Sequence, residues 1–446
     1  MPGAVGPRRF TDGRSTGWFL DAGLYALSAA FAAATATLAA IPLQREWGRI
    51  ALPTYLVAAS LAIVAGAVAR SGQRQRVVLA IAVFAGAAVA PMIIAVGTRA
   101  ATHPGAHAQS EVIVIEEGAH ALFRGDDPYR VEYLRGPLAG RPRATKTHVP
   151  YMPGMLVFGI PRALGGHEAW TDARVWFLGV SLVVGIAAIR RMRASPGGRL
   201  RTFQVMFALP TGAALVATGG DDVPVLALML LSVVLTDRDR AGAGGVAAGL
   251  ALGLKQISVL FVPFMVALAR GTARRRSLAA AALTAAAITL PFAVWDLPAF
   301  VEDAVAFPLG LGDGISAAKS PTLGSLIAGE GSGARLLAAA LMATIVLGLG
   351  YVLLVRRPPH DVSGASARAA TVLAVAMLFA PSTRAGLLVY PANLLVWAMA
   401  LRTVERQPTS DHVHQRSLPP SLDSPRTLRV RLRTMFERAF NLVATS

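Results

Sequence analysis

Residues 18–43, WFLDAGLYALSAAFAAATATLAAIPL, form one apolar run in which Asp21 carries the single charge. About 20 apolar residues in a helix cross the hydrocarbon core of a bilayer, so this run is long enough to span it. It is too long for a removable signal segment, whose apolar part covers about 7 to 15 residues. Arg8, Arg9 and Arg14 precede it. The run therefore predicts a first membrane-spanning helix that follows a cytoplasmic N-terminus.

Similar runs recur along the whole chain, and about twelve can be distinguished. They lie near residues 18–43, 50–69, 77–98, 173–189, 202–218, 222–236, 241–254, 257–269, 277–294, 335–355, 369–381 and 386–401. Hydrophobic residues make up 54% of the chain and charged residues 15%, against roughly 25% charged residues in an ordinary soluble domain. The sequence predicts an all-α polytopic membrane protein with about twelve transmembrane helices.

The charge and cysteine content narrow the class of function. The net charge is +18 and the chain has no cysteine, which excludes disulfides, thiolate metal sites and cysteine nucleophiles. In a soluble protein this charge would indicate nucleic-acid binding. In a membrane protein it is typical of cytoplasmic loops that lie against anionic lipid. We therefore expect the lipid bilayer, and no nucleic acid, as a partner.

The basic clusters predict the orientation of the chain in the cell membrane. They recur at every second turn between the apolar runs, which places both termini in the cytoplasm. Residues 1–402 would form the membrane unit, with a large extracytoplasmic loop at 99–170. Smaller extracytoplasmic turns would lie at 219–222, 295–333 and 380–384. Residues 403–446 would form a basic cytoplasmic tail, partly disordered, whose end has the spacing of an amphipathic helix.

The large loop contains the stretch SEVIVIEEGAHALFRGDDPY at 110–129, in which five carboxylates gather. Ser110 predicts the start of a helix and Gly125 its end, followed by a turn at 126–129. Helical spacing puts Glu116 and Glu117 on a wet face of an interfacial helix. Glu111 instead lies at the edge of the apolar stripe. There it acts either as a functional carboxylate, with a pKa raised by burial, or as a first-turn acid that the helix dipole stabilises.

Three parts of the chain resemble a known family. The matching residues in the first part are Glu111, Ala119, Ala121, Leu122, Phe123, Gly125, Pro128 and Tyr129. The second part is HVPYMPGMLVFGIPRAL at 148–164, and the third is VAAGLALGLKQISVLFVPF at 246–264. Over roughly 105–400 the chain resembles the GT-C glycosyltransferases, most closely glycosyltransferase family 87, which includes polyprenyl-phosphate-mannose-dependent mannosyltransferases. It departs from that pattern by having Glu111 where the family usually has Asp, Ile115 where an aromatic is usual, and two additional spans before the loop.

The resemblance implies a GT-C fold and an inverting sugar transfer at the extracytoplasmic face. The donor would be a polyprenyl-phosphate-linked sugar, with mannose favoured, and the acceptor a glycolipid or lipoglycan of the cell envelope. Glu111 would be the general base that takes the proton of the acceptor hydroxyl. Cations around the leaving phosphate suffice for this chemistry, so no cofactor is required. A divalent ion held by Asp126, Asp127 and His148 is the weaker alternative.

Isolated cations are the candidate phosphate ligands. Lys255, Lys319 and Arg384 each lie near the outer end of a different apolar run, where they would either bind the donor phosphate or snorkel to the interface. The candidates for sugar or acceptor binding are His148, Tyr151, Asp126, Asp127, Tyr129, Asp221 and Asp222. A turn or capping role is the alternative for these residues. Two other classes of protein stay open, a lipid or sugar transporter and a non-catalytic scaffold of envelope synthesis.

Overall fold

The computed structural model describes residues 12–68, 72–312, 318, 320–329 and 331–405. Throughout these residues the regular structure is helical and no strand is formed. The all-α prediction is therefore confirmed for the described part of the chain. The tail after residue 405 and Lys319 lie outside the described residues.

Nine helices in the described part are long and apolar enough to cross a membrane. They are α1 (Asp12–Leu38), α2 (Pro42–Val68), α3 (Gln73–Phe84) with η1 (Ala85–Val89) and α4 (Ala90–Ala101), α8 (Ala173–Arg191), α9 (Pro196–Phe203) with η5 (Gln204–Ala208) and α10 (Pro210–Thr218), α14 (Gly271–Trp295), α17 (Ser332–Tyr351) with η8 (Val352–Arg356), α18 (Val362–Phe379), and η9 (Ala385–Leu388) with α19 (Val389–Glu405).

The remaining predicted runs form shorter helices. They are α11 (Asp222–Asp237), α12 (Ala241–Leu254), and η6 (Gln256–Leu260) with α13 (Val262–Leu268). At about 1.5 Å per residue, none of these reaches the roughly 30 Å of a hydrocarbon core by itself. The number of spans is therefore nine by length in the described residues, and the predicted count of about twelve is not confirmed.

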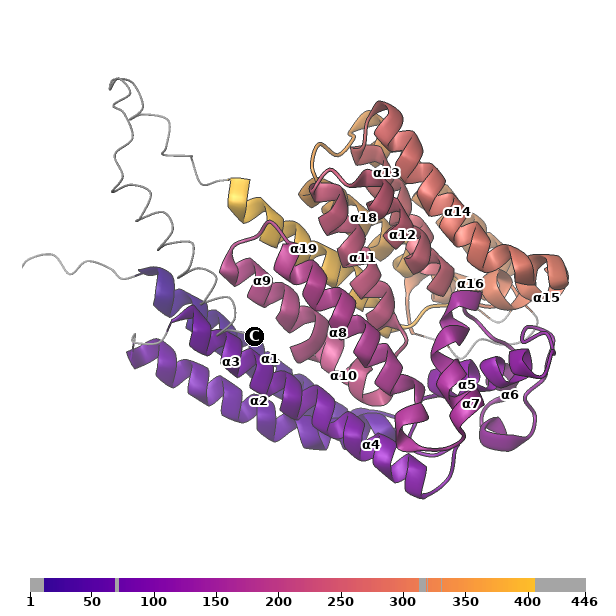
Figure 1. The fold of residues 1–446 in the computed structure, drawn as a ribbon, viewed down its shortest axis with the longest axis horizontal. Helices are drawn as coiled ribbons and strands as arrows, with labels where there is room; N and C mark the ends of the chain where they lie inside the picture. The colour runs from indigo at the N-terminus through magenta and orange to yellow at the C-terminus, as the bar shows by residue number, and fades with distance from the viewer. Residues whose placement is uncertain (1–11, 69–71, 313–317, 319, 330, 406–446) are drawn as a thin grey trace, which may run out of the picture. The chain divides into compact units, whose positions relative to one another are not determined.

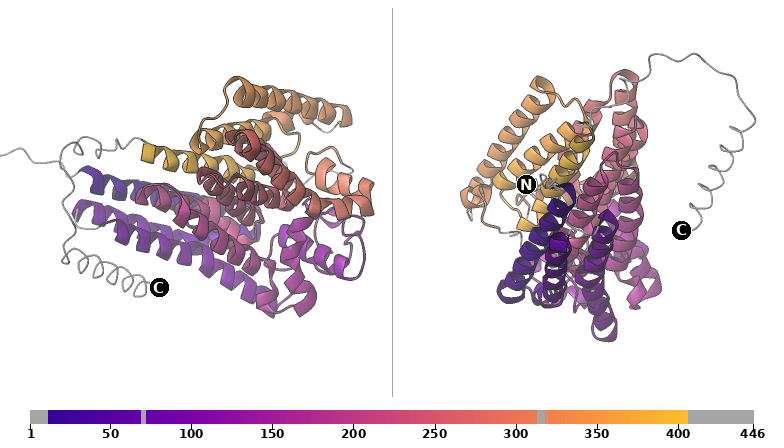
Figure 2. Two further views of the ribbon diagram at one scale, coloured as in Figure 1. Left: turned by 45° about the horizontal axis from the view of Figure 1, so that its top comes forward. Right: turned by 90° about the vertical axis from the view of Figure 1, so that its left-hand side faces the viewer.

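Two segments between the long helices contain only short elements. The segment between α4 and α8 forms α5 (Ser110–Phe123), η2 (Gly136–Leu138), α6 (Arg143–Lys146), η3 (Pro153–Gly159), α7 (Ile160–Gly165) and η4 (Ala169–Thr171). The segment between α14 and α17 contains α15 (Leu297–Val301), η7 (Glu302–Ala306) and α16 (Leu323–Ala328). Within residues 12–405, α5, α6 and α7 gather at the end of the long helices where α4 ends and α8 begins (Figures 1 and 2).

Buried aromatic side chains attach the N-terminal pair, α1 and α2, to the rest of the bundle. Tyr25, Trp47 and Tyr55 are each at most 2% exposed. The indole of Trp47 donates to the carbonyl of Ala87 at 2.8 Å, and the Tyr55 hydroxyl donates to the carbonyl of Ala208 at 2.8 Å. Trp47 and Tyr55 thus each donate a hydrogen bond to a backbone carbonyl of a π-helical turn, while their rings fill the apolar space between helices.

Small residues let α12 and α14 approach closely. A methyl group added to Gly245 would lie 2.3 Å from the carbonyl oxygen of Ser277, and one on Gly249 would lie 2.5 Å from that of Ala281. Glycines four apart lie on one helix face, so this face brings the two backbones into contact. The C-terminal end of α12, which leads into Lys255, is thereby fixed against α14.

Candidate active site

Glu111 lies in the first turn of α5 and is paired with Arg384, which follows α18 and precedes η9. The Arg384 guanidinium donates to the Glu111 carboxylate. The Glu111 side chain is 13% exposed and that of Arg384 is 45% exposed. The pair is therefore accessible from one side. The helix beneath it begins as predicted at Ser110, although Gln109 occupies the capping position and neither residue caps through its side chain.

Lys255 holds two neighbouring carboxylates together. Its ammonium donates to Asp221 at 2.8 Å and to Asp222 at 2.5 Å, and the Tyr390 hydroxyl also donates to Asp222 at 2.7 Å. The Lys255 side chain is 7% exposed and its ammonium lies 5.7 Å from the centre of the Tyr151 ring. The snorkelling alternative for Lys255 is therefore wrong, because its charge is buried and neutralised inside the protein.

These two groups form one electrostatic unit. Lys255 acts on the charge of Glu111, and Glu111 in turn acts on Asp221. We call the unit the carboxylate–cation cluster, and it consists of Glu111, Tyr151, Asp221, Asp222, Lys255, Arg384 and Tyr390. Its three carboxylates face two cations. The sequence-predicted residues Glu111, Tyr151, Asp221, Asp222, Lys255 and Arg384 are thus brought together from five separate parts of the chain.

The cluster shifts the pKa values of two of its carboxyl groups, those of Glu111 and Asp221, in opposite directions. Burial favours the protonated form of Glu111, but Arg384 overcomes this and lowers its pKa below the usual range. The expected rise in the pKa of Glu111 is therefore wrong, because the sequence did not reveal the partner. Burial raises the pKa of Asp221 to about 6, with Asp222 adding to the rise and Lys255 opposing it. Glu111 is thus kept ionised at neutral pH, whereas Asp221 titrates near pH 6.

Gly219 sets the distance between the two halves of the cluster. It ends α10 with φ of +96°, in the left-handed region that favours glycine. A methyl group at this position would lie 2.2 Å from Cγ2 of Val112, the residue after Glu111. The tip that carries Asp221 can therefore lie directly against the start of α5. Asp221 occupies the position before α11 without a side-chain capping bond, so the predicted capping role is not formed.

Four other predicted residues lie outside the cluster. His148 stacks on Phe307 with ring centres 3.9 Å apart. Asp126 is half exposed and pairs with Arg124 at 3.2 Å. Asp127 accepts from the backbone of Tyr129 at 3.0 Å, and the Tyr129 hydroxyl donates to the carbonyl of Tyr151 at 2.9 Å.

These contacts explain what the four residues do in the fold. The turn predicted at 126–129 is confirmed, and so is the end of the helix at Gly125, whose φ is +81°. Tyr129 supports the backbone of Tyr151 from outside the cluster. Among the described residues no three His, Asp or Glu side chains are grouped to hold a metal ion.

Asp303 is a buried acid that sequence reasoning missed. Its carboxyl accepts a hydrogen bond from the backbone N–H of Val149 at 2.7 Å and is 3% exposed. Burial, with smaller contributions from Glu302 and Asp127, raises its pKa to about 8. It therefore carries a proton at neutral pH. It fastens η7 to the segment that precedes Tyr151.

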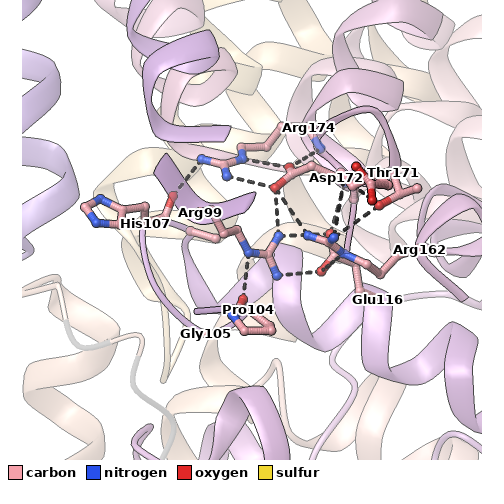
Figure 3. A network of polar contacts seen from close by, with 12 residues as sticks. Arg99, Pro104, Gly105, His107, Glu116, Arg162, Thr171, Asp172 and Arg174 are labelled. Atoms are coloured by element: carbon pink, nitrogen blue, oxygen red, sulfur yellow. Dashed lines mark hydrogen bonds and ion pairs between the residues drawn. The ribbon is translucent and has the colours of Figure 1, made fainter. Parts of the chain in front are cut away.

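The predicted wet face of α5 is wrong at Glu116. This side chain is 2% exposed and forms a bidentate pair with Arg99, at 3.0 and 2.6 Å. Arg162 also lies 3.4 Å from it. Figure 3 shows these groups converging in a buried network that Asp172 and Arg174 complete. Helical spacing missed it because the α5 face opposite the apolar stripe contacts α4, α7 and α8 rather than water.

This network fastens α5 to three other elements. Asp172 accepts from Arg99 at 2.8 Å and from Arg174 at 2.8 and 2.9 Å. Arg174 also donates to the carbonyl of His107 at 2.8 Å, just before α5. In the sequence these residues are ordinary loop or helix-end charges, and nothing in their spacing pairs them. Only the packing of α4, α5, α7 and α8 shows that they hold the helix that carries Glu111.

Comparison with known proteins assigns the larger part of the chain to a protein family. The family model described as Glycosyltransferase family 87 matches residues 150–391. The matched part contains every member of the carboxylate–cation cluster except Glu111, which precedes it. No curated protein and no solved structure matches the chain. The family resemblance that rested on short motifs is thereby confirmed over 150–391.

Proposed function

The chain belongs to glycosyltransferase family 87, and we propose that this membrane glycosyltransferase transfers mannose from a polyprenyl-phosphate carrier. The acceptor is a glycolipid or lipoglycan of the cell envelope. The reaction takes place at the extracytoplasmic face of the cell membrane, with both termini in the cytoplasm. The observation that carries the proposal is the accessible pair of Glu111 and Arg384 beside the buried Lys255.

Glu111 is the proposed general base. Its carboxylate takes the proton of the acceptor hydroxyl as the hydroxyl oxygen attacks the anomeric carbon. The bond between that carbon and the phosphate oxygen breaks with inversion, and the polyprenyl phosphate leaves with the bonding electrons. The low pKa of Glu111 means that the base is ionised before the donor arrives. Departure of a phosphate needs cationic stabilisation but no metal ion.

Arg384 is the proposed phosphate ligand. It is the more exposed cation of the cluster, and its planar guanidinium matches phosphate oxygens two at a time. Lys255 already holds two carboxylates, so it contributes positive potential rather than a free donor. When the phosphate takes Arg384, Glu111 loses part of the interaction that lowers its pKa and becomes a stronger base. Lys319, outside the described residues, remains the third proposed cation.

The neighbouring polar groups complete the proposed binding site. Asp221, whose pKa is raised to about 6, and Asp222 are the proposed acceptors of hydrogen bonds from sugar hydroxyls. The Tyr151 ring offers an apolar surface for a sugar face. His148, Asp126 and Asp127 are not part of the proposed site, because the contacts described for them lie outside the cluster. Tyr129 contacts the cluster only through the backbone carbonyl of Tyr151 and is also left out of the proposed site.

The test is transfer of radiolabelled mannose from polyprenyl-phosphomannose into membrane lipids, in vesicles that contain the full chain. Glu111→Gln removes the base while keeping its size, and we expect a loss of about 10²- to 10⁴-fold. Glu132→Gln is the matched control, because Glu132 is an exposed acid of the same segment and should retain wild-type transfer. Vesicles are compared at equal protein abundance.

The outcomes separate the parts of the proposal. Equal transfer by wild type and Glu111→Gln would overturn the role of Glu111 as the base. No transfer by wild type would overturn mannose on this carrier as the donor, and other lipid-linked sugars would then be screened. A scaffold protein would keep its cellular function in Glu111→Gln, whereas an enzyme would lose it.

A further inference from the structure

A cavity lies at the opposite end of α18 from Arg384. Its volume is about 440 Å³, within the range of roughly 300 to 1,000 Å³ that small-molecule sites occupy. It opens near the start of α18, whereas Arg384 follows the end of that helix. The lining reaches Thr371 within α18, and residues 372–379, which complete the helix, rise by about 12 Å. No lining residue belongs to the carboxylate–cation cluster. The cavity is therefore distinct from the carboxylate–cation cluster.

The lining of this cavity combines cations with aliphatic side chains. Six of its lining residues carry the argument: Leu349, Leu353, His360, Asp361, Arg368 and Arg402. The two arginines outnumber the single aspartate. The Asp361 carboxylate accepts from the backbone N–H of Gly364 at 2.5 Å, so part of its charge is used to cap α18. The net charge of the lining therefore favours an anion.

The guanidinium groups of Arg368 and Arg402 have N–H donors without an acceptor among the described residues. Arg368 makes no hydrogen bond or ion pair with any residue that the structure describes. Arg402 donates from Nε to the hydroxyl of Ser363 at 2.9 Å, which fixes the direction of its guanidinium. Within the described part of the chain its terminal nitrogens have no hydrogen-bond acceptor. An arginine pair with free terminal donors matches the oxygens of a phosphate group.

A second wall of the cavity comes from a helix whose apolar surface is largely exposed. Leu349 and Leu353 lie where α17 passes into the π-helical turn η8. In the most apolar window of this helix only 6% of the residues are buried inside the protein. The backbone N–H of Arg357 closes the turn on the carbonyl of Val352 at 2.8 Å, and such turns often mark functional sites. A ligand here would have phosphate on one side and hydrocarbon on the other.

We infer that this cavity binds the phosphate of an anionic phospholipid, with Arg368 and Arg402 on the headgroup and Leu349 and Leu353 against its chains. Free inorganic phosphate shares the headgroup chemistry but not the apolar contact. The site does not depend on the proposed sugar transfer. It gives the protein a preference for anionic lipid at the membrane face opposite Arg384.

The test is lipid-dependent stability of the purified full chain in an uncharged detergent. Its apparent Tm is measured with added phosphatidylglycerol, phosphatidylethanolamine or inorganic phosphate, and retained lipid is counted by native mass spectrometry. We expect phosphatidylglycerol to raise the Tm of the wild type. Arg368→Gln should weaken that binding by about five- to tenfold. Because Arg368 has no partner among the described residues, this variant should fold normally.

Two comparisons decide the outcome. Arg357→Gln makes the same change of charge on an exposed neighbour outside the cavity and should keep wild-type binding. An equal loss in Arg357→Gln would overturn the site in favour of general attraction to a basic surface. Equal stabilisation by inorganic phosphate or phosphatidylethanolamine, or none by phosphatidylglycerol, would also overturn it. The double variant with Arg402→Gln should lose the remaining preference.

Discussion

Arg384 donates a hydrogen bond to the carboxylate of Glu111, although the two residues lie 273 positions apart in the chain. Glu111 begins the helix of the large polar segment, and Arg384 lies in the turn between the last two described helices. Their contact joins two segments of the candidate active site that lie far apart in the sequence. It also reverses the effect that burial alone would have on the acid.

The first prediction concerns this pair. In Arg384→Gln the burial of Glu111 is no longer opposed by its main partner, so the pKa of Glu111 should rise above its wild-type value. A general base must be ionised, so transfer should fall at neutral pH and recover as the pH is raised. The measurement is the pH profile of kcat/KM in vesicles. Its acidic limb should move to higher pH in Arg384→Gln.

Two further variants control this experiment. Arg384→Lys keeps the positive charge and should keep the acidic limb near its wild-type position. Arg135→Gln removes an exposed arginine from the segment between α4 and α8 and should change neither the rate nor the profile. A loss of rate in Arg384→Gln that is the same at every pH would contradict the effect on Glu111 and leave only phosphate binding.

The second prediction concerns the buried network of Figure 3. Glu116→Gln removes the carboxylate that forms a bidentate pair with Arg99 and lies 3.4 Å from Arg162, and it leaves Asp172 as the carboxylate that still contacts both arginines. Breaking a buried pair by removing one partner costs about 3–5 kcal/mol of unfolding free energy. Glu117→Gln changes the neighbouring acid, which is outside the network, and should stay within about 1 kcal/mol of wild type. Unfolding of the purified protein in detergent measures both, and equal stability of the two variants would refute the account.

The third prediction concerns Asp303. Its pKa of about 8 lies above the ordinary value of 3.8. Between about pH 4 and pH 8, Asp303 is therefore protonated in the folded protein and ionised in the unfolded chain. Folding takes up that proton, so stability from this group falls by up to about 1.4 kcal/mol per pH unit as the pH rises through that window. Below about pH 4 the contribution of Asp303 to the free energy of unfolding is complete, and above about pH 8 that contribution is lost.

Asp303→Asn should remove this slope. The amide keeps an oxygen for the N–H of Val149 but does not titrate. The variant should therefore gain stability relative to wild type between pH 6 and pH 8. Chemical unfolding at the two pH values measures the difference. An unchanged slope would show that Asp303 is ionised in the folded protein, contrary to the raised pKa.

The fourth prediction concerns Gly219. Gly219→Ala forces a side chain into the left-handed region, at about 1–2 kcal/mol, and places its methyl group against Val112 and Arg174. The start of α5 must then move away from Asp221, so mannose transfer should fall with stability. Gly97→Ala is the control, because nothing lies within 4 Å of the added methyl group. Wild-type transfer by Gly219→Ala would show that the spacing of the cluster is not critical.

Much of the fold and of the site could be read from the sequence. Apolar runs of bilayer length predicted the long helices, because in such segments the local pattern and the final environment agree. The end of α5 at Gly125 followed from backbone chemistry at one position. Glu111, Lys255 and Arg384 could be singled out because charged residues beside apolar runs are costly unless they are paired or functional.

The sequence did not show how these charges are paired. Glu116 and Glu117 are adjacent acids on one helix, yet only Glu116 is nearly completely buried, with Arg99 and Arg162 against it. Lys255 resembled an interfacial cation and is instead held by Asp221 and Asp222. His148 lies near Tyr151 in the chain but contacts Phe307 instead of joining the cluster. Each of these differences depends on a partner from another element.

By itself the sequence determined where helices form, which residues are chemically able to act, and the family over 150–391. These properties follow from local hydrophobicity, backbone preference and residue type. Only the tertiary structure decided which carboxylate meets which cation, and with that the ionisation of Glu111 and Asp221. The physical reason is that the energy of a buried charge depends on atoms a few ångströms away, and those atoms come from distant parts of the chain.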